Sequence, residues 1–308
     1  MTVAQAASRA AQPAAPVRVP AERRHLIALD IDGTMMDHGV LANGSTLDGG
    51  HINTELVAAI RTLHRVGHEV VLATGRSTDS TLPVVEFLRI RPEWVVSANG
   101  AVTLKRDPLA DRAYRREYVE AFDPTDALLR IRTHLVSAHY AVELADGSFL
   151  YTEEIPSGTL PAKQRRVAFD DLLGVQASRV VVVSPDHHLE EFLQVVETVG
   201  LTSVTYAVGR TAWLDIAPHG VTKASALETI AGRLGIEDSR IFAAGDGQND
   251  LEMLRWAGRQ GDSVAMGQAS AEVRAAARRV TGTITEHGLL TALRERFPAE
   301  LASGSGPA

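Results

Sequence analysis

The stretch LIALDIDGT, at residues 26–34, runs from four apolar residues into two carboxylates, a glycine and a hydroxyl. Its apolar part is short, follows the charged pair Arg23-Arg24 and lacks helical spacing, so we expect a buried strand of a parallel sheet. A turn begun by Gly33 can aim Asp30 and Asp32 at one ligand. Paired carboxylates repel unless a cation or a proton lies between them, which favours a hard metal ion such as Mg²⁺. For a lone acid pair, a polar strand end capped by a turn is the alternative.

Three other stretches share this design, because each places polar residues at the end of an apolar run or at the start of a helix. EVVLA at 69–73 leads into Thr74-Gly75-Arg76, and RIFAA at 240–244 leads into GDGQND. Lys223 opens an amphipathic helix. Together these are the ingredients of one phosphate-handling site.

Four motifs therefore occur in order: DIDGT at 30–34, ATGR at 73–76, Lys223 and GDGQND at 245–250. With these motifs the chain resembles the haloacid dehalogenase superfamily of phosphohydrolases, and specifically its Cof-like branch of sugar-phosphate and related phosphatases. Any one of the motifs alone would be a weak signal, whereas the ordered set is a strong one.

Strands and helices alternate in the first third of the chain. Strands at 69–73 and 94–97 follow the first one, with a helix begun by Asn53 or Thr54 and a second helix at 78–90 that we expect to be interrupted near Pro83. This alternation predicts an α/β fold with a doubly wound, Rossmann-like parallel sheet, whose ligands bind beyond the carboxyl ends of the strands.

The pattern changes near residue 105, where paired strands, a hairpin at Ala145-Asp146-Gly147 and irregularly placed helices replace the regular alternation. We expect the core pattern to resume with Trp213 to Ile216. The resemblance also implies a large inserted cap. The expected organisation is a flexible tail at 1–24, a catalytic core at 25–105 and 214–299, an inserted α+β cap domain at 106–213, and a flexible tail at 300–308.

Composition narrows the class of protein. The 308 residues, 45% of them hydrophobic, suit an ordinary globular enzyme, and a net charge of −7 argues against a dedicated nucleic-acid binder. The lack of cysteine excludes disulfides, thiolate catalysis and cysteine-based zinc sites. No stretch reaches membrane-spanning length, so we expect a cytoplasmic protein without a membrane partner. The sequence leaves the oligomeric state open. The Ala- and Pro-rich start would also suit an organellar transit peptide.

Hydrolysis of a phosphate monoester needs charge neutralisation, an in-line nucleophile and a proton donor. The resemblance implies that Asp30 is the nucleophile, which forms an aspartyl-phosphate, and that Asp32 is the general acid and base. The residues alone do not decide which of the two acids attacks.

Asp246 and Asp250 form a second acidic pair. We expect Asp246 to ligate the metal together with Asp30 and the backbone carbonyl of Asp32, and Asp250 to ligate through water or to fix the other ligands. A set of oxygen ligands favours Mg²⁺ over zinc or copper.

The remaining candidates would bind the phosphoryl group. The Thr74 hydroxyl can bind a phosphoryl oxygen or merely cap a turn, and Lys223 can pair with a phosphate at its helix N-terminus or remain a solvated surface lysine. Arg76 could reach substrate or form a salt bridge. Further candidates are Gly75 for close backbone approach, Asn249 for orienting Asp30 or a phosphate oxygen, and Gly33, Thr34 and Asn99 for the floor of the site.

Three functions fit these residues. The first is a Mg²⁺-dependent phosphatase that acts on a small phosphorylated metabolite, with the cap shielding the intermediate. The second is a phosphotransferase or phosphomutase with the same first half-reaction. The third is a protein that only binds a phosphorylated ligand, although such a protein would not need Asp32 or Lys223.

Overall fold

Five parallel strands form the core sheet, in the order β16-β15-β14-β1-β4, in the computed structural model, which describes residues 18–37, 46–47, 50–155, 163–208 and 212–302. The strands are β1 (Leu26–Leu29), β4 (Glu69–Leu72), β14 (Ile241–Gly245), β15 (Asp262–Ala265) and β16 (Arg279–Val280). Leu29 lies level with Leu72 and Ala244 in the register. The carboxyl ends of three adjacent strands therefore meet at one edge of the core sheet.

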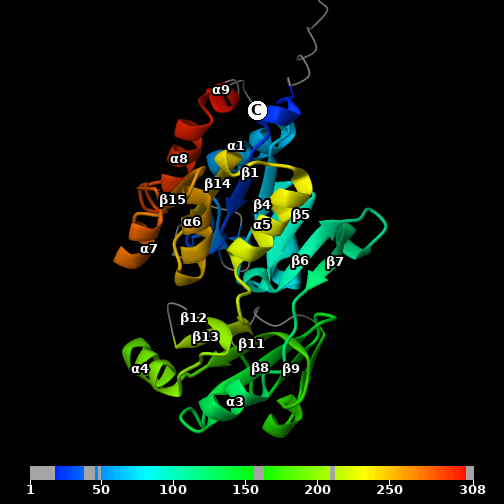
Figure 1. Cartoon of the computed structure of the whole chain (residues 1–308), viewed down its shortest axis with the longest axis vertical. Coiled ribbons are helices and arrows are strands. Elements are labelled where there is room, and N and C mark those ends of the chain that lie inside the picture. Colours follow the sequence, from blue (N-terminus) through cyan, green and yellow to red (C-terminus); the bar gives the residue numbers. More distant parts are fainter. Residues whose placement is uncertain (1–17, 38–45, 48–49, 156–162, 209–211, 303–308) are drawn as a thin grey trace, which may run out of the picture.

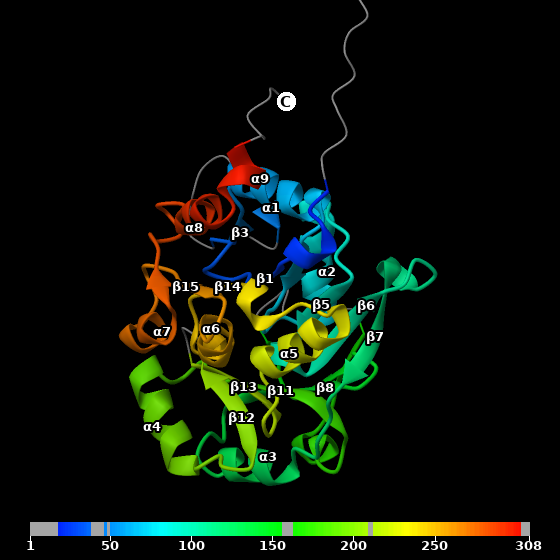
Figure 2. The ribbon, with the colours of Figure 1, turned by 45° about the horizontal axis from the view of Figure 1, so that its top comes forward.

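Helices cover both faces of this sheet, because alternate side chains of β1 point to opposite sides. The helices of this part are α1 (Thr54–Val66), α2 (Thr78–Leu88), α5 (Lys223–Leu234), α6 (Leu251–Gly258), α7 (Ala271–Ala276), α8 (Gly288–Arg296) and α9 (Pro298–Ala302). Ile27 and Leu29 pack with α1, α2 and α8, whereas Leu26 and Ala28 pack with α5 and α6 (Figures 1 and 2). The predicted doubly wound α/β fold is confirmed.

Local signals explain most helix boundaries. The Asn53 side chain accepts hydrogen bonds from the N–H groups of Glu55 and Leu56 and so caps α1, which ends at Gly67 with a φ of 110°. The expected interruption of α2 near Pro83 is wrong, because the helix continues through this residue. Pro83 cannot donate to the Asp79 carbonyl four residues earlier, and Arg112 Nη1 donates to that carbonyl instead, at 3.4 Å.

A small antiparallel sheet extends the core beside β4. It consists of β5 (Trp94–Ser97), β6 (Val102–Arg106) and β7 (Tyr114–Val119), and a parallel bridge from Ala73 to Val96 joins it to the end of β4. A two-stranded pair, β2 (Thr46–Leu47) and β3 (Gly50–His51), precedes α1. The core therefore widens on the side from which the chain leaves for the second sheet.

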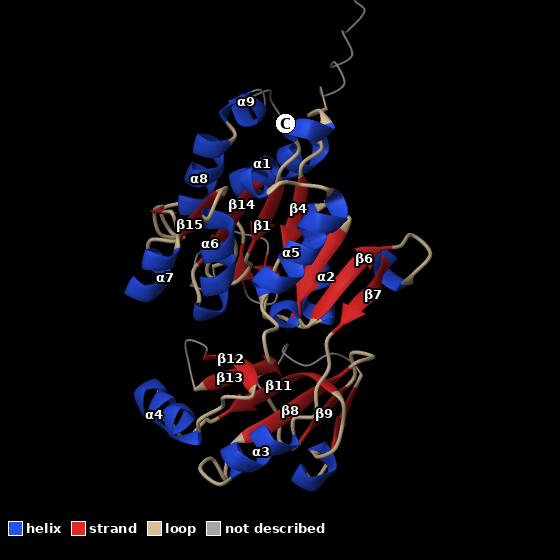
Figure 3. Ribbon diagram, viewed as in Figure 1, coloured by secondary structure: helices blue, strands red, loops and turns tan. Residues whose placement is uncertain are grey.

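The second sheet, called the cap sheet here, has the strand order β10-β9-β8-β11-β13-β12. Its strands are β8 (His139–Leu144), β9 (Phe149–Tyr151), β10 (Gln164–Arg166), β11 (Ala177–Val183), β12 (Val204–Val208) and β13 (Trp213–Pro218). Two helices, α3 (Thr125–Arg132) and α4 (Leu189–Val199), pack on one face through a separate hydrophobic cluster. The opposite face of the cap sheet is turned toward the core, as Figure 3 shows.

Strand pairing places the change between the two sheets later in the chain than expected. Trp213 to Ile216 does not resume the core sheet, because β13 pairs antiparallel with β11 and β12. Likewise β7 pairs with β6 on the core side. We propose on this basis that the insert spans residues 120–219 rather than 106–213.

Of the two expected tails, residues 1–17 and 303–308 lie outside the described residues, as does most of the loop that follows the DIDGT motif. The described parts hold a short 3₁₀ turn at Ala21–Arg23 and the helix α9. Among the described helices, none combines the length and the apolar character that a bilayer crossing requires.

Candidate active site

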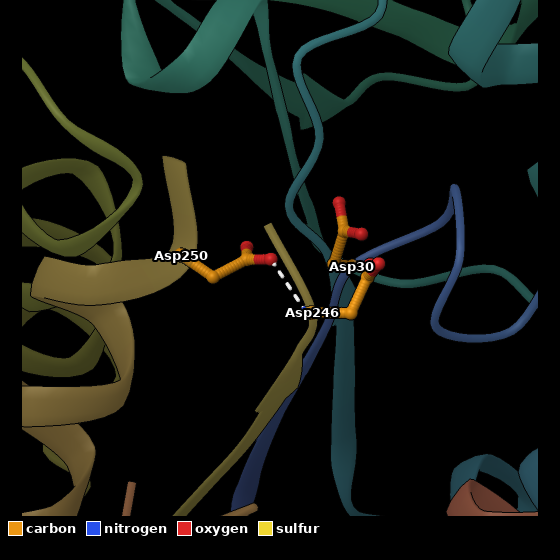
Figure 4. A group of neighbouring side chains, drawn as sticks. All are labelled: Asp30, Asp246 and Asp250. Carbon is orange, nitrogen blue, oxygen red and sulfur yellow. Dashed lines mark hydrogen bonds between the residues drawn. The ribbon is translucent and has the colours of Figure 1, made fainter. Parts of the chain in front are cut away.

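Three carboxylates converge at the carboxyl edge of the core sheet. Asp30 directly follows β1, Asp246 directly follows β14, and Asp250 closes the 3₁₀ turn at Gln248–Asp250. One oxygen from each lies within 4.8 Å of the others, and all three residues are buried. Figure 4 shows the carboxylates turned toward one another from these separate elements. The three are called the acid cluster below.

Lys223 supplies the positive charge for this cluster. It is the first residue of α5 and has no exposed surface, and its Nζ donates to Asp30 Oδ1 and to Asp250 Oδ1, at 2.7 Å each. The alternative of a solvated surface lysine is therefore wrong. Three carboxylates face one ammonium group, which leaves the cluster with a formal charge of −2.

The pKa values follow from this arrangement. Burial raises the pKa of the Asp30 carboxyl well above its usual range, Asp250 raises it further, and Lys223 opposes both. Burial alone would lower the pKa of Lys223, but the attraction of Asp250 and Asp30 outweighs it and the pKa is raised. Both directions indicate a shortage of positive charge around Asp30.

Asp250 is held so that it organises the others. Its Oδ2 accepts hydrogen bonds from the backbone N–H groups of Asp246 and Gly247, at 2.9 Å each, while Oδ1 accepts from Lys223. A Cβ on Gly245 would lie 2.4 Å from the Asp250 carboxyl carbon, so only glycine fits there. These contacts use much of the acceptor capacity of Asp250, as expected of a residue that fixes the other ligands.

Asp32 is not one of the three converging acids. Its carboxylate accepts from Arg76 Nε at 2.8 Å and from Arg76 Nη2 at 2.6 Å, and its side chain is 39% exposed. Of the two roles left open for Arg76, the structure therefore has the salt bridge. This bidentate geometry fixes both the position and the orientation of the Asp32 carboxylate.

The other predicted residues surround the acid cluster. Thr34 Oγ1 donates to Asp246 Oδ1 at 3.1 Å. Thr74 Oγ1 accepts from the Arg76 N–H at 3.1 Å, which is the turn-capping contact that we considered. Asn249 Nδ2 donates to Asn99 Oδ1 at 2.9 Å, which joins two loops 150 residues apart.

Two glycines permit close packing beside these residues. A Cβ on Gly75 would lie 3.1 Å from the Asn99 amide oxygen. Gly100 has a φ of 102°, and a Cβ there would lie 2.2 Å from the Thr222 carbonyl oxygen. Both therefore let the 98–100 turn lie directly against its neighbours, on one side the ATGR loop and on the other the start of α5.

Sequence reasoning missed Gln268. Its Nε2 donates to the Gly33 carbonyl oxygen at 2.6 Å, and its Oε1 accepts from the Ile284 N–H at 3.1 Å. Gln268 therefore stabilises the turn that follows the two acids of the DIDGT motif. The signal was present, because Gln268 lies just beyond the carboxyl end of β15, at the same edge of the sheet.

A cavity of about 550 Å³, called the cap–core cavity below, opens beside Lys223. Asn99, Thr222 and Asn249 line it from the core, and residues of α4, β12 and β13 line it from the cap sheet. Its volume lies in the range of pockets that enclose small molecules. A molecule bound there would lie between the two sheets, next to the Lys223 side chain that contacts Asp30 and Asp250.

The acid cluster can hold a metal ion. Its donors are carboxylate oxygens only, and a divalent cation would balance the formal charge of −2 that Lys223 leaves. Asp30 and Asp246 contribute oxygens that face this position, and Asp250 holds the loop that carries Asp246.

Comparison with known proteins agrees with this geometry. The family model for haloacid dehalogenase-like hydrolases matches residues 27–293, so the chain belongs to this family, and it is an enzyme of the phosphatase type. A 5-amino-6-(5-phospho-D-ribitylamino)uracil phosphatase, YitU of Bacillus subtilis, is 28% identical over 279 residues, which are 89% of this chain and 97% of that protein.

Two further relatives show how widely the family extends. A phosphoglycolate phosphatase of Natronomonas pharaonis is 27% identical over 267 residues, 87% of this chain and 95% of that protein. The solved structure of BT4131, a sugar phosphatase of haloacid dehalogenase subclass IIB, superimposes with a TM-score of 0.69 at 20% identity, over 89% of this chain and 99% of that chain. The latter likeness concerns the fold alone.

Proposed function

We propose that this enzyme is a Mg²⁺-dependent phosphatase that hydrolyses a small phosphorylated metabolite through an aspartyl-phosphate on Asp30. The observation that carries the proposal is the buried Asp30 carboxylate, which Lys223 contacts at 2.7 Å beside two further acids and a cavity. The relatives named above act on phosphorylated compounds as different as a ribitylaminouracil phosphate and phosphoglycolate, which supports the reaction class and leaves the substrate open.

Asp30 would attack phosphorus with one carboxylate oxygen. The new bond joins Asp30 to phosphorus as the bond to the leaving alcohol oxygen breaks, and Asp32 gives that oxygen its proton. Asp32 would then take a proton from water, which attacks phosphorus, releases inorganic phosphate and restores the Asp30 carboxylate. Lys223 donates to Asp30 and would keep the carboxylate oriented throughout.

Mg²⁺ would be held by Asp30, Asp246 and the backbone carbonyl of Asp32, and when bound it would offset the negative charge of the phosphoryl group. Arg76 would hold Asp32 at the leaving-group side until the proton is transferred. Thr74 and the adjacent backbone would contact the phosphoryl oxygens, and Asn249 would be kept in place by Asn99.

The test is release of inorganic phosphate from p-nitrophenyl phosphate and from sugar phosphates, with Mg²⁺ or with a chelator. We expect hydrolysis that needs the metal and disappears in Asp30→Asn, in which the carboxylate nucleophile is lost but the fold is kept. The matched control is Asp238→Asn, an exposed acid just before β14, which should leave the rate unchanged. Full activity of Asp30→Asn would refute the assignment, and transfer of phosphate to an added alcohol without free phosphate would indicate a phosphotransferase.

A further inference from the structure

One end of the cap–core cavity is lined by Lys223, which contacts Asp30 and Asp250, and residues of α4, β12 and α6 also line the cavity. Lys223 and Asn249 lie at the first end, where the proposed function places the phosphoryl group. The remaining lining must then face the alcohol part of the ester. The chemistry of this second end decides which alcohols fit, so the inference below rests on the proposed function.

Negative charge dominates the lining on the alcohol side. Four carboxylates line the cavity, and Lys223, the one cation among the described lining residues, already contacts Asp30 and Asp250. The four are Asp215, Glu197, Glu252 and Glu272. They come from both the cap sheet side and the core side, so they face a bound alcohol from two directions.

These carboxylates differ in how far neighbours neutralise them. Asp215 accepts from Arg179 Nε at 2.7 Å and from Trp213 Nε1 at 3.2 Å, and is compensated. Within the described part of the chain, Glu272 accepts only from the neutral Gln248 amide, at 3.2 Å. Glu252 has a cation no nearer than Arg255 Nη1, at 4.0 Å, and no ion pair involves Glu197 among the described residues. The described neighbours therefore do little to neutralise the charges of Glu197, Glu252 and Glu272.

Helix N-termini work in the opposite direction, since they attract anions, and residues in the first turns of α4, α5, α6 and α7 line the cavity. Glu252 lies in the first turn of α6 and already provides the negative charge that this end favours. The N-terminus of α6 therefore does not offset the acids around it.

Apolar surface makes up the rest of the second end. Tyr206 on β12 is 41% exposed and Leu193 on α4 is 39% exposed, although both line the cavity. Leu189 of α4 and Leu251 of α6 also line the cavity. Exposed aromatic and aliphatic side chains in a pocket favour a ligand that covers them with a flat or apolar group.

We propose that the substrates are monophosphate esters whose alcohol part is uncharged or cationic and carries a ring or apolar group that packs on Tyr206 and Leu193. Bisphosphates and phosphorylated carboxylic acids are the classes that this cavity disfavours, because their second anion would lie among Glu197, Glu252 and Glu272.

The test compares three esters that share the reacting group and differ in one substituent: 4-methylbenzyl phosphate, 4-carboxybenzyl phosphate and 4-(aminomethyl)benzyl phosphate. We expect kcat/KM for the carboxylate to be at least about 10-fold below that for the methyl compound, and the amine to be at least as good as the methyl compound. The difference should shrink as salt is added.

Two sets of variants assign the effect to residues. The triple variant Glu197→Gln, Glu252→Gln, Glu272→Gln should raise kcat/KM for the carboxylate several-fold relative to kcat/KM for the methyl compound. Glu190→Gln, an exposed acid of α4 outside the cavity lining, is the matched control. Tyr206→Ala should raise KM for the benzyl esters several-fold, and Tyr206→Phe, which keeps the ring, should restore it.

The outcomes separate this inference from the proposed function. Hydrolysis that is as fast for the carboxylate as for the methyl compound overturns the inference and keeps the phosphatase. If no ester is hydrolysed, the proposed function fails, and calorimetric binding of the same three esters to Asp30→Asn still decides the inference. Weaker binding of the carboxylate supports it, and equal or tighter binding of the carboxylate overturns it.

Discussion

Arg76 forms two hydrogen bonds with Asp32. Its Nε donates to one carboxylate oxygen at 2.8 Å, and its Nη2 donates to the other at 2.6 Å. The pair joins the loop after β4 to the loop after β1, and the Arg76 side chain is only 12% exposed. The Asp32 carboxylate, for which we propose the role of proton donor and acceptor, is thereby held in one orientation while 39% of its side-chain surface remains exposed.

Replacing Arg76 distinguishes a residue that positions Asp32 from one that binds substrate. We expect Arg76→Leu to lower kcat by about 10- to 100-fold, a part of what general acid–base catalysis contributes, with little change in KM. Steady-state kinetics with p-nitrophenyl phosphate and Mg²⁺ measure both constants. Arg115→Leu, on the exposed part of β7, is the control. A KM that rises while kcat stays constant would instead show that Arg76 binds the phosphoryl group directly.

Lys223→Met removes the ammonium group that contacts Asp30 and Asp250, so it tests how far the acid cluster depends on this positive charge. Without the ammonium group, the buried carboxylates of Asp30 and Asp250 lose the cation that contacts both of them, and we expect a loss of about 3–5 kcal/mol in the free energy of unfolding when no metal is present. Added Mg²⁺ should raise the melting temperature more in this variant than in the wild type. Lys163→Met, at an exposed lysine, should change neither quantity. An equal response of Lys223→Met and wild type to Mg²⁺ would argue against metal binding at this cluster.

Arg116 ties the cap sheet to the core. Its Nη2 donates to Glu143 Oε1 on β8 at 3.1 Å and to Thr78 Oγ1 on α2 at 3.2 Å, and its Nη1 donates to the Ala145 carbonyl at 3.2 Å. Burial raises the pKa of Glu143, which has no exposed surface, and both Arg179 and Arg116 oppose the rise.

Removing this arginine should therefore leave a buried carboxylate with one cation fewer. We expect Arg116→Ala to lower the free energy of unfolding by about 3 kcal/mol, and Glu143→Gln in the same chain to recover part of the loss. Urea unfolding of the two single variants and the double variant measures the coupling between the residues. Strictly additive losses would show that the two residues do not interact.

His68, which lies outside the acid cluster, should make the free energy of unfolding depend on pH. Burial lowers its pKa to about 4, with His25 and Arg24 adding to the shift, and its Nδ1 accepts from the His25 N–H at 3.1 Å. Because the folded pKa lies below the unfolded value, the contribution is full above pH 6.5 and is lost as the pH falls toward 4. We expect a loss of about 2–3 kcal/mol between pH 7 and pH 4.5.

Urea unfolding at pH 7 and at pH 4.5 measures this loss. His68→Gln keeps an acceptor for the His25 N–H but cannot titrate, so the loss should be smaller by most of that amount. The exposed His134→Gln should leave it unchanged. The same acid sensitivity in His68→Gln as in the wild type would assign the effect to other groups, such as His25 and His64, whose pKa values burial also lowers.

The sequence predicted those parts of the fold and the site that depend on local pattern. Apolar runs that end in polar motifs placed Asp30 and Asp246 at the correct edge of the sheet, because parallel strands share the direction in which they end. A lysine in the first turn of a helix led us to expect a phosphate beside Lys223, and the structure places two carboxylates in contact with it.

What the sequence did not predict depends on contacts between distant residues. The residue pattern of β13 is that of any buried strand. Its pairing with β11 could therefore not be predicted from the pattern alone. Similarly, Arg76 had two plausible partners until the loop carrying Asp32 was placed beside it. Pro83 suggested a helix break, and only the position of Arg112 explains how the freed carbonyl finds a donor.

Asp30 and Lys223 are 193 positions apart along the chain, and their contact has a consequence for biosynthesis. When a ribosome has made the first strand, the residue that will neutralise its aspartate has not yet been translated, and neither has β14, which lies beside that strand in the finished sheet. The Asp30–Lys223 contact and the five-stranded core sheet can therefore form only after the last third of the chain, which carries α5, β14, β15 and β16, has been made.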